Sequence, residues 1–294
     1  MKVLILGRAG QVARELATAD WPAGLEPVIA GRPEFDMARP ETLEPLLTRT
    51  APMVVINATA YTAVDKAEAE PGLAFAVNRD GPARLAELCR QRGFALLHIS
   101  TDYVFDGAKA APYLEDDAVA PLNVYGASKE AGEAAIRALC SRHLILRTSW
   151  VYGVHGQNFV KTMLRLGVER KELRVVADQH GAPTAAADIA AVLVRIAETA
   201  AGREEAPWGT CHYGGGGDTT WYGLADHIFE AQERATGRRP RLVAIATADY
   251  PAPARRPANS RLDCSRIGRA FGIACRPWRE GVDRVLEALQ PFRQ

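Results

Sequence analysis

A tyrosine and a lysine four residues apart, Tyr125 and Lys129, are the residues of this sequence best suited to proton transfer. On a helix, positions i and i+4 lie on one face, so the phenol and the ammonium can stand side by side. A nearby ammonium favours the phenolate and lowers a phenol pKa of ~10 toward neutrality. Such a pair also occurs by chance in many helices, so other features must support Tyr125 as a proton shuttle.

Two hydroxyl residues, Ser100 and Thr101, end an apolar run that precedes this pair. The run at 95–99 predicts a buried strand, which delivers Thr101 at its carboxyl end. Open α/β sheets bind ligands at the carboxyl ends of their strands. Thr101 is therefore a second candidate for the same site.

The first half of the chain alternates short apolar runs with helical patterns. Runs of this length are typical of strands buried on both faces. The alternation predicts an α/β fold of the Rossmann type, a doubly wound parallel sheet with a smaller α/β lobe. The predicted strands cover residues 2–6, 26–30, 53–57, 95–99 and 143–147.

A glycine turn joins the first predicted strand to a helix. Gly7 permits a tight turn, Gly10 lets the backbone approach a pyrophosphate, and the helix start offers free N–H groups. Ala13 stands where a third glycine would allow close helix–strand packing, which is a mild departure. An ordinary βα turn is the alternative, but the position after the first strand favours a dinucleotide-binding loop.

An arginine follows the second predicted strand, where Rossmann domains often carry an acid for the ribose hydroxyls. Arg32 occupies this neighbourhood, and the nearest acid is Glu34. An arginine can meet a 2′-phosphate, which points to NADP(H) or to tolerance of both NADPH and NADH. An arginine solvated at the surface is the alternative.

After the third strand, the small Ala58 and Ala60 would let the cofactor ribose or nicotinamide approach.

The alternation of elements is lost beyond Gly153. We expect residues 1–152 to form the dinucleotide-binding domain, rejoined by segments near 184–217, and 153–294 to form mainly a substrate-binding lobe. Trp150, just past the fifth strand, is either a core anchor or a wall against a sugar ring, and its position favours the wall. Arg256 is a candidate phosphate partner, because guanidinium groups match phosphate oxygens, or else a surface arginine.

The composition excludes several classes of protein. Net charge is +1 over 294 residues, which gives no electrostatic case for nucleic acid or a membrane surface. The five cysteines are scattered and form no C-x-x-C pair, which favours a reducing compartment and argues against a zinc site. No signal segment and no apolar run of about 20 residues is present, so we expect a cytoplasmic protein.

With these stretches in hand, the chain resembles the extended short-chain dehydrogenase/reductase superfamily and, within it, the dTDP-4-dehydrorhamnose reductases. The likeness runs nearly end to end, and the stretches at 100–107 and 147–152 are the most specific to this branch. The other stretches that carry it are 7–12, 57–68, 121–133, 158–159, 178–184 and 253–260.

The resemblance implies a reductase that uses NADPH or NADH to reduce the C4 ketone of dTDP-6-deoxy-L-lyxo-4-hexulose, giving dTDP-L-rhamnose. It implies that Tyr125 is the proton donor. Lys129 would bind the nicotinamide ribose and lower the pKa of the Tyr125 phenol, and Thr101 would correspond to the superfamily's catalytic serine or threonine. The implied cofactor contacts are Gly10, Gln11, Val12, Asp36, Met37, Ala60, Tyr61 and Thr62. The substrate candidates are Thr101, Asp102, Trp150, Asn158 and Arg256.

Some relatives form a dimer through a carboxylate-bound magnesium. Glu15 matches one such position, but Ala187 stands where another acid would be, so we predict no metal and not that assembly, although a homodimer stays open. Two other functions also stay open. One is a non-catalytic NADP(H)-binding subunit, like the regulatory subunit of methionine adenosyltransferase. The other is a different nucleotide-sugar ketoreductase, epimerase or dehydratase, although a dehydratase would carry an Asp-Glu pair where this chain has Asp102-Tyr103.

Overall fold

A six-stranded parallel sheet forms the base of the computed structural model, which describes residues 1–202 and 206–289. The strand order is β10-β5-β4-β3-β1-β2, and every neighbouring pair is parallel. The strands are β1 (Lys2–Leu6), β2 (Glu26–Ala30), β3 (Val54–Asn57), β4 (Ala95–Thr101), β5 (His143–Thr148) and β10 (Gly209–His212). The predicted α/β class and parallel sheet are therefore confirmed.

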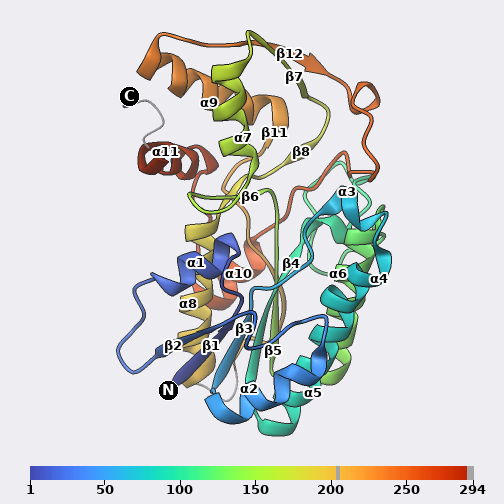
Figure 1. Cartoon of the computed structure of the whole chain (residues 1–294), viewed down its shortest axis with the longest axis vertical. Helices are drawn as coiled ribbons and strands as arrows, with labels where there is room; N and C mark the ends of the chain where they lie inside the picture. Colours follow the sequence, from blue (N-terminus) through green and yellow to red (C-terminus); the bar gives the residue numbers. More distant parts are fainter. Residues whose placement is uncertain (203–205, 290–294) are drawn as a thin grey trace.

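Helices cover both faces of this sheet, and each face has its own apolar core (Figure 1). One core joins the sheet to α1, α8 and α10, and the other joins it to α2, α5 and α6. The bounds are α1 (Gln11–Ala17), α2 (Leu43–Thr50), α5 (Gly81–Arg92), α6 (Val124–Leu139), α8 (Ala186–Gly202) and α10 (Ser265–Phe271). Two short helices, α3 (Val64–Ala67) and α4 (Pro71–Phe75), lie near the carboxyl end of the sheet on the α6 side.

A smaller lobe sits over the carboxyl ends of the strands (Figure 1). Its core is built from three helices and a parallel strand pair, β7 with β12. The elements are α7 (Phe159–Glu169), α9 (Trp221–Thr236), α11 (Trp278–Leu289), β7 (Glu172–Val176) and β12 (Arg241–Ile245). Three further short strands, β6 (Val151–Tyr152), β8 (His180–Gly181) and β9 (Thr184–Ala185), lead into it, and β11 (Thr219–Thr220) pairs with β8.

The boundaries differ from the sequence prediction at two places that matter for the site. The fourth strand runs through Ser100 and Thr101 instead of ending at Ile99, because Thr101 still pairs with Thr148 of β5. The helical segment between β3 and β4 is not one continuous helix but α4, a wide π-type turn at 76–80 and α5. Pro82 explains part of this break, since proline lacks the N–H that a continuous helix needs.

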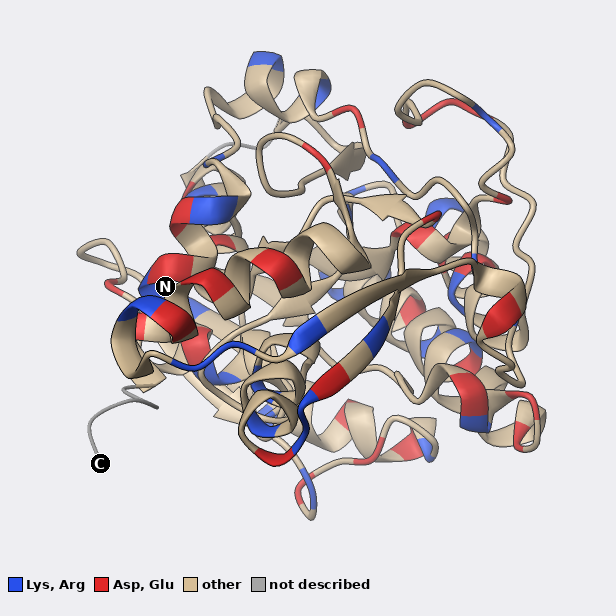
Figure 2. Cartoon of the chain, turned by 90° about the horizontal axis from the view of Figure 1, so that it is seen from above, with Lys and Arg blue, Asp and Glu red and all other residues tan. Residues whose placement is uncertain are grey.

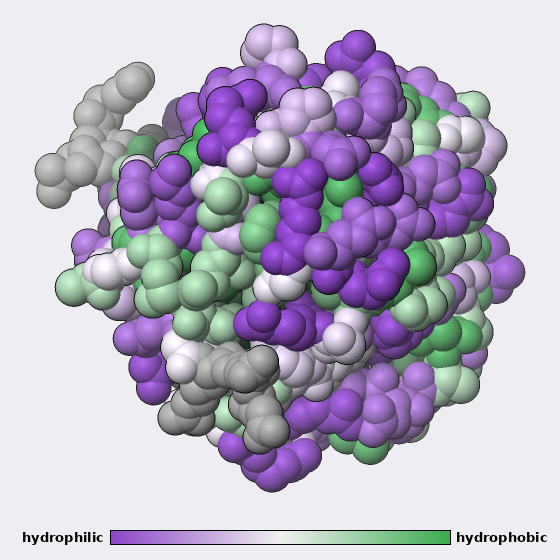
Figure 3. All heavy atoms as spheres, turned by 90° about the horizontal axis from the view of Figure 1, so that it is seen from below, coloured by the Kyte–Doolittle hydropathy of each residue, from purple (hydrophilic) through white to green (hydrophobic). Residues whose placement is uncertain are grey.

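The molecular surface carries both charges in mixture. Figure 2 shows basic and acidic residues interleaved along the elements rather than gathered on one side. The end of the sheet opposite the lobe mixes polar residues with small apolar patches (Figure 3). Within residues 1–202 and 206–289, no helix has the length and apolar character needed to cross a membrane.

Candidate active site

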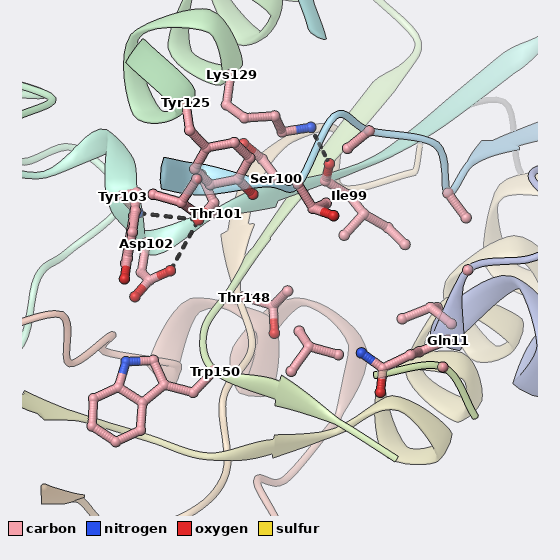
Figure 4. A pocket seen from close by; sticks show the side chains of 18 of the residues that line it. Gln11, Ile99, Ser100, Thr101, Asp102, Tyr103, Tyr125, Lys129, Thr148 and Trp150 are labelled. Atoms are coloured by element: carbon pink, nitrogen blue, oxygen red, sulfur yellow. Dashed lines mark hydrogen bonds between the residues drawn. The ribbon is translucent and has the colours of Figure 1, made fainter. Parts of the chain in front are cut away.

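A cavity of about 550 Å³ opens between the carboxyl ends of the strands and the lobe. Figure 4 shows Tyr125 and Lys129 on one side of it and Trp150 on the other, with Gln11 at the far end. The lining comes from the first βα turn, the ends of β4 and β5, helix α6 and the start of α9. The sheet topology therefore brings together residues that lie far apart in sequence.

Thr101 ends β4 with its side chain on this cavity. Its hydroxyl accepts from the backbone N–H of Tyr103 at 3.2 Å and donates to Asp102 Oδ1 at 2.9 Å (Figure 4). Burial raises the pKa of Asp102 to about 7, although the hydroxyls of Ser260 and Thr101 oppose the shift. Thr101 is thus held in one orientation, with its single proton directed to Asp102 and its oxygen on the cavity.

Lys129 does not act on Tyr125 as the sequence suggested. Its Nζ lies 3.1 Å from His98 Nε2. It also donates to the carbonyl of Ile99 at 2.8 Å (Figure 4). Burial raises the pKa of Tyr125 to about 12, with a further rise from Asp102. The prediction of a lowered phenol pKa was wrong for this state of the protein, because i,i+4 spacing fixes a shared helix face but not where a long side chain ends.

The raised pKa of Tyr125 gives a direct prediction. A phenol with a pKa of about 12 keeps its proton through the neutral and mildly alkaline range and ionises only as the pH approaches 12. We expect the tyrosinate absorbance of the wild type and of Tyr125→Phe, recorded without cofactor, to coincide up to mildly alkaline pH. An extra tyrosinate in the wild type near pH 8 would contradict this expectation.

Trp150 combines the two roles that the sequence left open. Its indole stacks on Trp221 at 3.6 Å between ring centroids and 6° between planes, and both residues line the cavity. Its Nε1 donates to Ser260 Oγ at 3.2 Å. A Cβ at Gly181 would lie 2.4 Å from the indole, so a glycine is required there. Trp150 is therefore packed against Trp221 and Gly181 and is also part of the cavity lining.

A second cavity of about 580 Å³ continues from the first along the glycine turn. Gly7 has a φ of +123°, and a Cβ there would lie 3.2 Å from the carbonyl oxygen of Ala58, so this turn admits glycine best. Helix α1 begins at Gln11 with no side-chain cap on its first N–H groups. An extended groove with free N–H groups in its middle fits a dinucleotide.

The far end of this groove carries two arginines. Arg32 is exposed and lines the groove, as does Arg8, which pairs with Glu34 at 2.8 Å. Glu34 also accepts from the backbone N–H of Gly31. The nearest acid is thus already engaged. Sequence reasoning missed Arg8, whose place in the glycine turn was the only available signal.

Most of the predicted site residues line one of the two cavities. The first cavity takes Gly10, Gln11, Val12, Ala58, Ala60, Thr62, Thr101, Asp102, Tyr125, Lys129 and Trp150. The second takes Gly7, Gly10, Arg32, Asp36, Met37, Ala58, Ala60 and Tyr61.

Two substrate candidates lie outside these linings. Asn158 caps α7 and donates to Gln11 Oε1 at 2.9 Å. Arg256 forms an ion pair with Asp65 at 2.7 Å. Asp65 belongs to α3, so this ion pair ties the segment around Arg256 to that helix.

Several lining residues were missed at the sequence level. Trp221, the first residue of α9, is the most prominent, and nothing local in the sequence linked it to Trp150. The others in the first cavity include Thr59, Ser100, Tyr103, Thr148 and Gln157. Among the described residues, no cluster of three or more His, Cys, Asp or Glu side chains could hold a metal ion.

Comparisons with known proteins agree over nearly the whole chain. A family model described as "RmlD substrate binding domain" matches residues 1–291. The dTDP-4-dehydrorhamnose reductase of Sinorhizobium fredii is 46% identical over 290 residues, which are 98% of each chain. The solved dTDP-4-dehydrorhamnose reductase of Clostridium acetobutylicum has a TM-score of 0.91 at 36% identity and covers 99% of this chain and 100% of its own. That of Bacillus anthracis, in complex with NADP, has a TM-score of 0.90 at 34% identity and covers 98% and 99%.

Proposed function

The chain belongs to the RmlD substrate-binding-domain family, and on that premise we propose that it is an NAD(P)H-dependent dTDP-4-dehydrorhamnose reductase with Tyr125 as its proton donor. It reduces the C4 ketone of dTDP-6-deoxy-L-lyxo-4-hexulose to give dTDP-L-rhamnose. The observation that carries the proposal is the convergence of Thr101, Tyr125 and Lys129 on one cavity that continues into a dinucleotide-shaped groove.

The chemistry assigned to the side chains follows from where charge develops. When bound, NADPH or NADH would supply the hydride, and negative charge would then grow on the ketone oxygen. The Tyr125 hydroxyl hydrogen-bonds that oxygen and gives up its proton to it, and the Thr101 hydroxyl turns its proton from Asp102 to the same oxygen. A phenol with a pKa of about 12 is fully protonated at neutral pH, which suits this acid role. Trp150 and Asp102 would hold the sugar, so positioning supplies much of the rate.

The cofactor is held by residues of the glycine turn and of the groove beyond it. Gly7, Gly10 and the start of α1 would take the pyrophosphate, and Lys129 the nicotinamide ribose. Asn158 and Arg256 are assigned to the support of the cleft, since Asn158 holds Gln11 and Arg256 holds Asp65. No metal enters this assignment.

Arg32 should discriminate between the two cofactors. We expect Arg32→Ala to raise the KM for NADPH by roughly 10-fold or more with little effect on NADH, because a guanidinium–phosphate bond is worth about 1.5–3 kcal/mol. Initial rates with each cofactor measure the effect. Arg165→Ala is the control, since Arg165 is exposed and lies outside both cavities. Equal effects on the KM for NADPH and for NADH would mean that Arg32 is a solvated surface arginine that does not contact the 2′-phosphate.

The proposal is tested by mixing the purified protein with a dTDP-4-keto-6-deoxy sugar, a 3,5-epimerase and either NADPH or NADH. We expect loss of the reduced-cofactor absorbance together with formation of dTDP-L-rhamnose. Binding of NADPH without any oxidation would instead support a non-catalytic regulatory subunit. Oxidation with a different keto-sugar only would support another nucleotide-sugar ketoreductase.

The proposal also covers the domains of the chain, its location in the cell and its partners. Residues 1–152, with the segment near 184–217, would bind the dinucleotide, and 153–294 mainly the substrate. The pairing of β10 with β5 supports the return of the second segment, although 203–205 and 290–294 lie outside the described residues. Five free cysteines fit a cytoplasmic location. One chain supplies all the proposed site residues, so the proposed reaction requires no nucleic acid, membrane or second subunit. A homodimer is also compatible with this site.

A further inference from the structure

A buried chain of hydrogen bonds connects Thr59 to the amino group of Lys129. Thr59 contributes its backbone N–H, at 3.1 Å, and its hydroxyl, at 2.6 Å, to Asn57 Oδ1. Asn57 Nδ2 lies 3.0 Å from His98 Nδ1, and His98 Nε2 lies 3.1 Å from Lys129 Nζ. Asn57, His98 and Lys129 are at most 1% exposed, so bulk water does not compete for these bonds.

The donors and acceptors in this row of hydrogen bonds can be assigned from one group whose role is fixed. The backbone N–H of Thr59 can only donate, so Asn57 Oδ1 accepts and Nδ2 donates. His98 Nδ1 must then accept, and a neutral imidazole that accepts at one nitrogen carries its proton on the other. His98 Nε2–H is therefore a donor toward Lys129 Nζ. Only a neutral amine has the lone pair to accept it.

A protonated Lys129 would leave two donors facing each other inside the protein. Turning the amide of Asn57 would not remove the conflict, because its Nδ2 would then face the N–H of Thr59. A buried donor without an acceptor costs about 1–3 kcal/mol. The arrangement of the four residues thus disfavours the charged form of Lys129.

We propose that His98 is a positioning residue that favours the neutral amine of Lys129 in the cofactor-free protein and so links cofactor binding, at mildly alkaline pH, to the uptake of one proton. The inference rests on the proposed function for the identity of the ligand. The proton comes from solvent and adds to the lone pair of Nζ, and no electrons are transferred. The charged Nζ must then leave His98 and turn to the cavity that Lys129 lines, where ribose hydroxyls can accept its bonds.

The charged groups around Lys129 support this direction. Burial lowers the pKa of Lys129 to about 8, and only Glu133 opposes the shift. Glu133 is engaged by Arg147 at 2.7 Å and by Arg137 at 2.9 Å. Burial alone already lowers the pKa of His98, and the charged forms of Lys129 and His143 would lower it further, so His98 is neutral, as the bond pattern requires.

The first experiment is an NMR titration of the cofactor-free protein with labelled lysine side chains. The chain has six lysines, so the signals are few, and Lys129→Arg identifies the one of interest. We expect Lys129 to titrate near pH 8, against about 10.5 for an ordinary lysine. A Lys129 signal that titrates with the other lysines would overturn the proposal.

Asn57→Asp tests this explanation, because it reverses the donor and acceptor roles along the row of hydrogen bonds. Its carboxylate accepts from both Thr59 and His98 Nδ1–H, which frees His98 Nε2 to accept from an ammonium. The midpoint of Lys129 should rise by a unit or more. If this variant does not fold, His98→Gln should also raise the midpoint, since an amide oxygen can accept from the ammonium. His143→Gln is the control, because His143 is buried nearby but bonds to the carbonyl of Cys140. Unchanged midpoints in the variants of Asn57 and His98 would contradict the proposal.

Calorimetry of NADPH binding at pH 9, in buffers of different ionisation enthalpy, measures the linked proton. We expect the wild type to take up a proton in nearly every binding event and the Asn57→Asp variant to take up clearly less. NADPH binding without proton uptake would refute the linkage. Failure to bind NADPH at all would count against the proposed function instead, and the NMR titration would still decide the effect of His98.

Discussion

Replacement of Tyr125 by phenylalanine should lower kcat by roughly 10²–10⁴-fold while leaving cofactor binding largely intact. The substitution removes one oxygen from the cavity and keeps the ring, which contacts Tyr103 edge-on at 5.9 Å between centroids. The ketone oxygen then gains charge without a proton donor beside it. Steady-state kinetics measure the loss, and NADPH titration of the variant measures cofactor binding.

Tyr113→Phe is the matched control for this variant. Tyr113 is a buried tyrosine whose hydroxyl donates to Asp106 at 2.7 Å, and it lines neither cavity. Its substitution should leave kcat within a few-fold of the wild type. Near-normal turnover of Tyr125→Phe would reject Tyr125 as the donor.

Replacement of Thr101 by valine should lower kcat/KM by roughly 10²–10³-fold, the usual cost of losing one donor to a developing oxyanion. Valine keeps the shape of threonine and lacks the hydroxyl, so the variant tests the hydroxyl as a whole. It also removes the acceptor for the N–H of Tyr103 and the donor to Asp102. Kinetics with the keto-sugar measure the effect.

Thr101→Ser separates the chemical role from the structural one. Serine retains the hydroxyl and both of its bonds, and it should keep most of the activity. The melting temperatures of both variants show whether the end of β4 stays folded. Loss of activity in Thr101→Ser equal to that in Thr101→Val would mean that the methyl group, and not the hydroxyl, is what the site needs.

The sequence alone determined the main elements of the fold and the candidate residues for the site. Buried strands and the glycine turn are encoded by local patterns, since apolar runs and glycines act over a few residues. The strands at 2–6 and 26–30 match β1 and β2, and the predicted parallel sheet is confirmed. Thr101, Tyr125 and Lys129 share a cavity because the sequence places them at a strand end and on the following helix.

Only the tertiary structure decided what these groups contact. Lys129 meets His98 because β4 lies beneath α6, and Trp150 meets Trp221 because the lobe folds back over the sheet. The sign of the Tyr125 pKa shift depends on burial and on neighbours remote in sequence. Periodicity specifies which face of an element is buried, whereas the end point of a long side chain and the dielectric around it depend on how the elements pack.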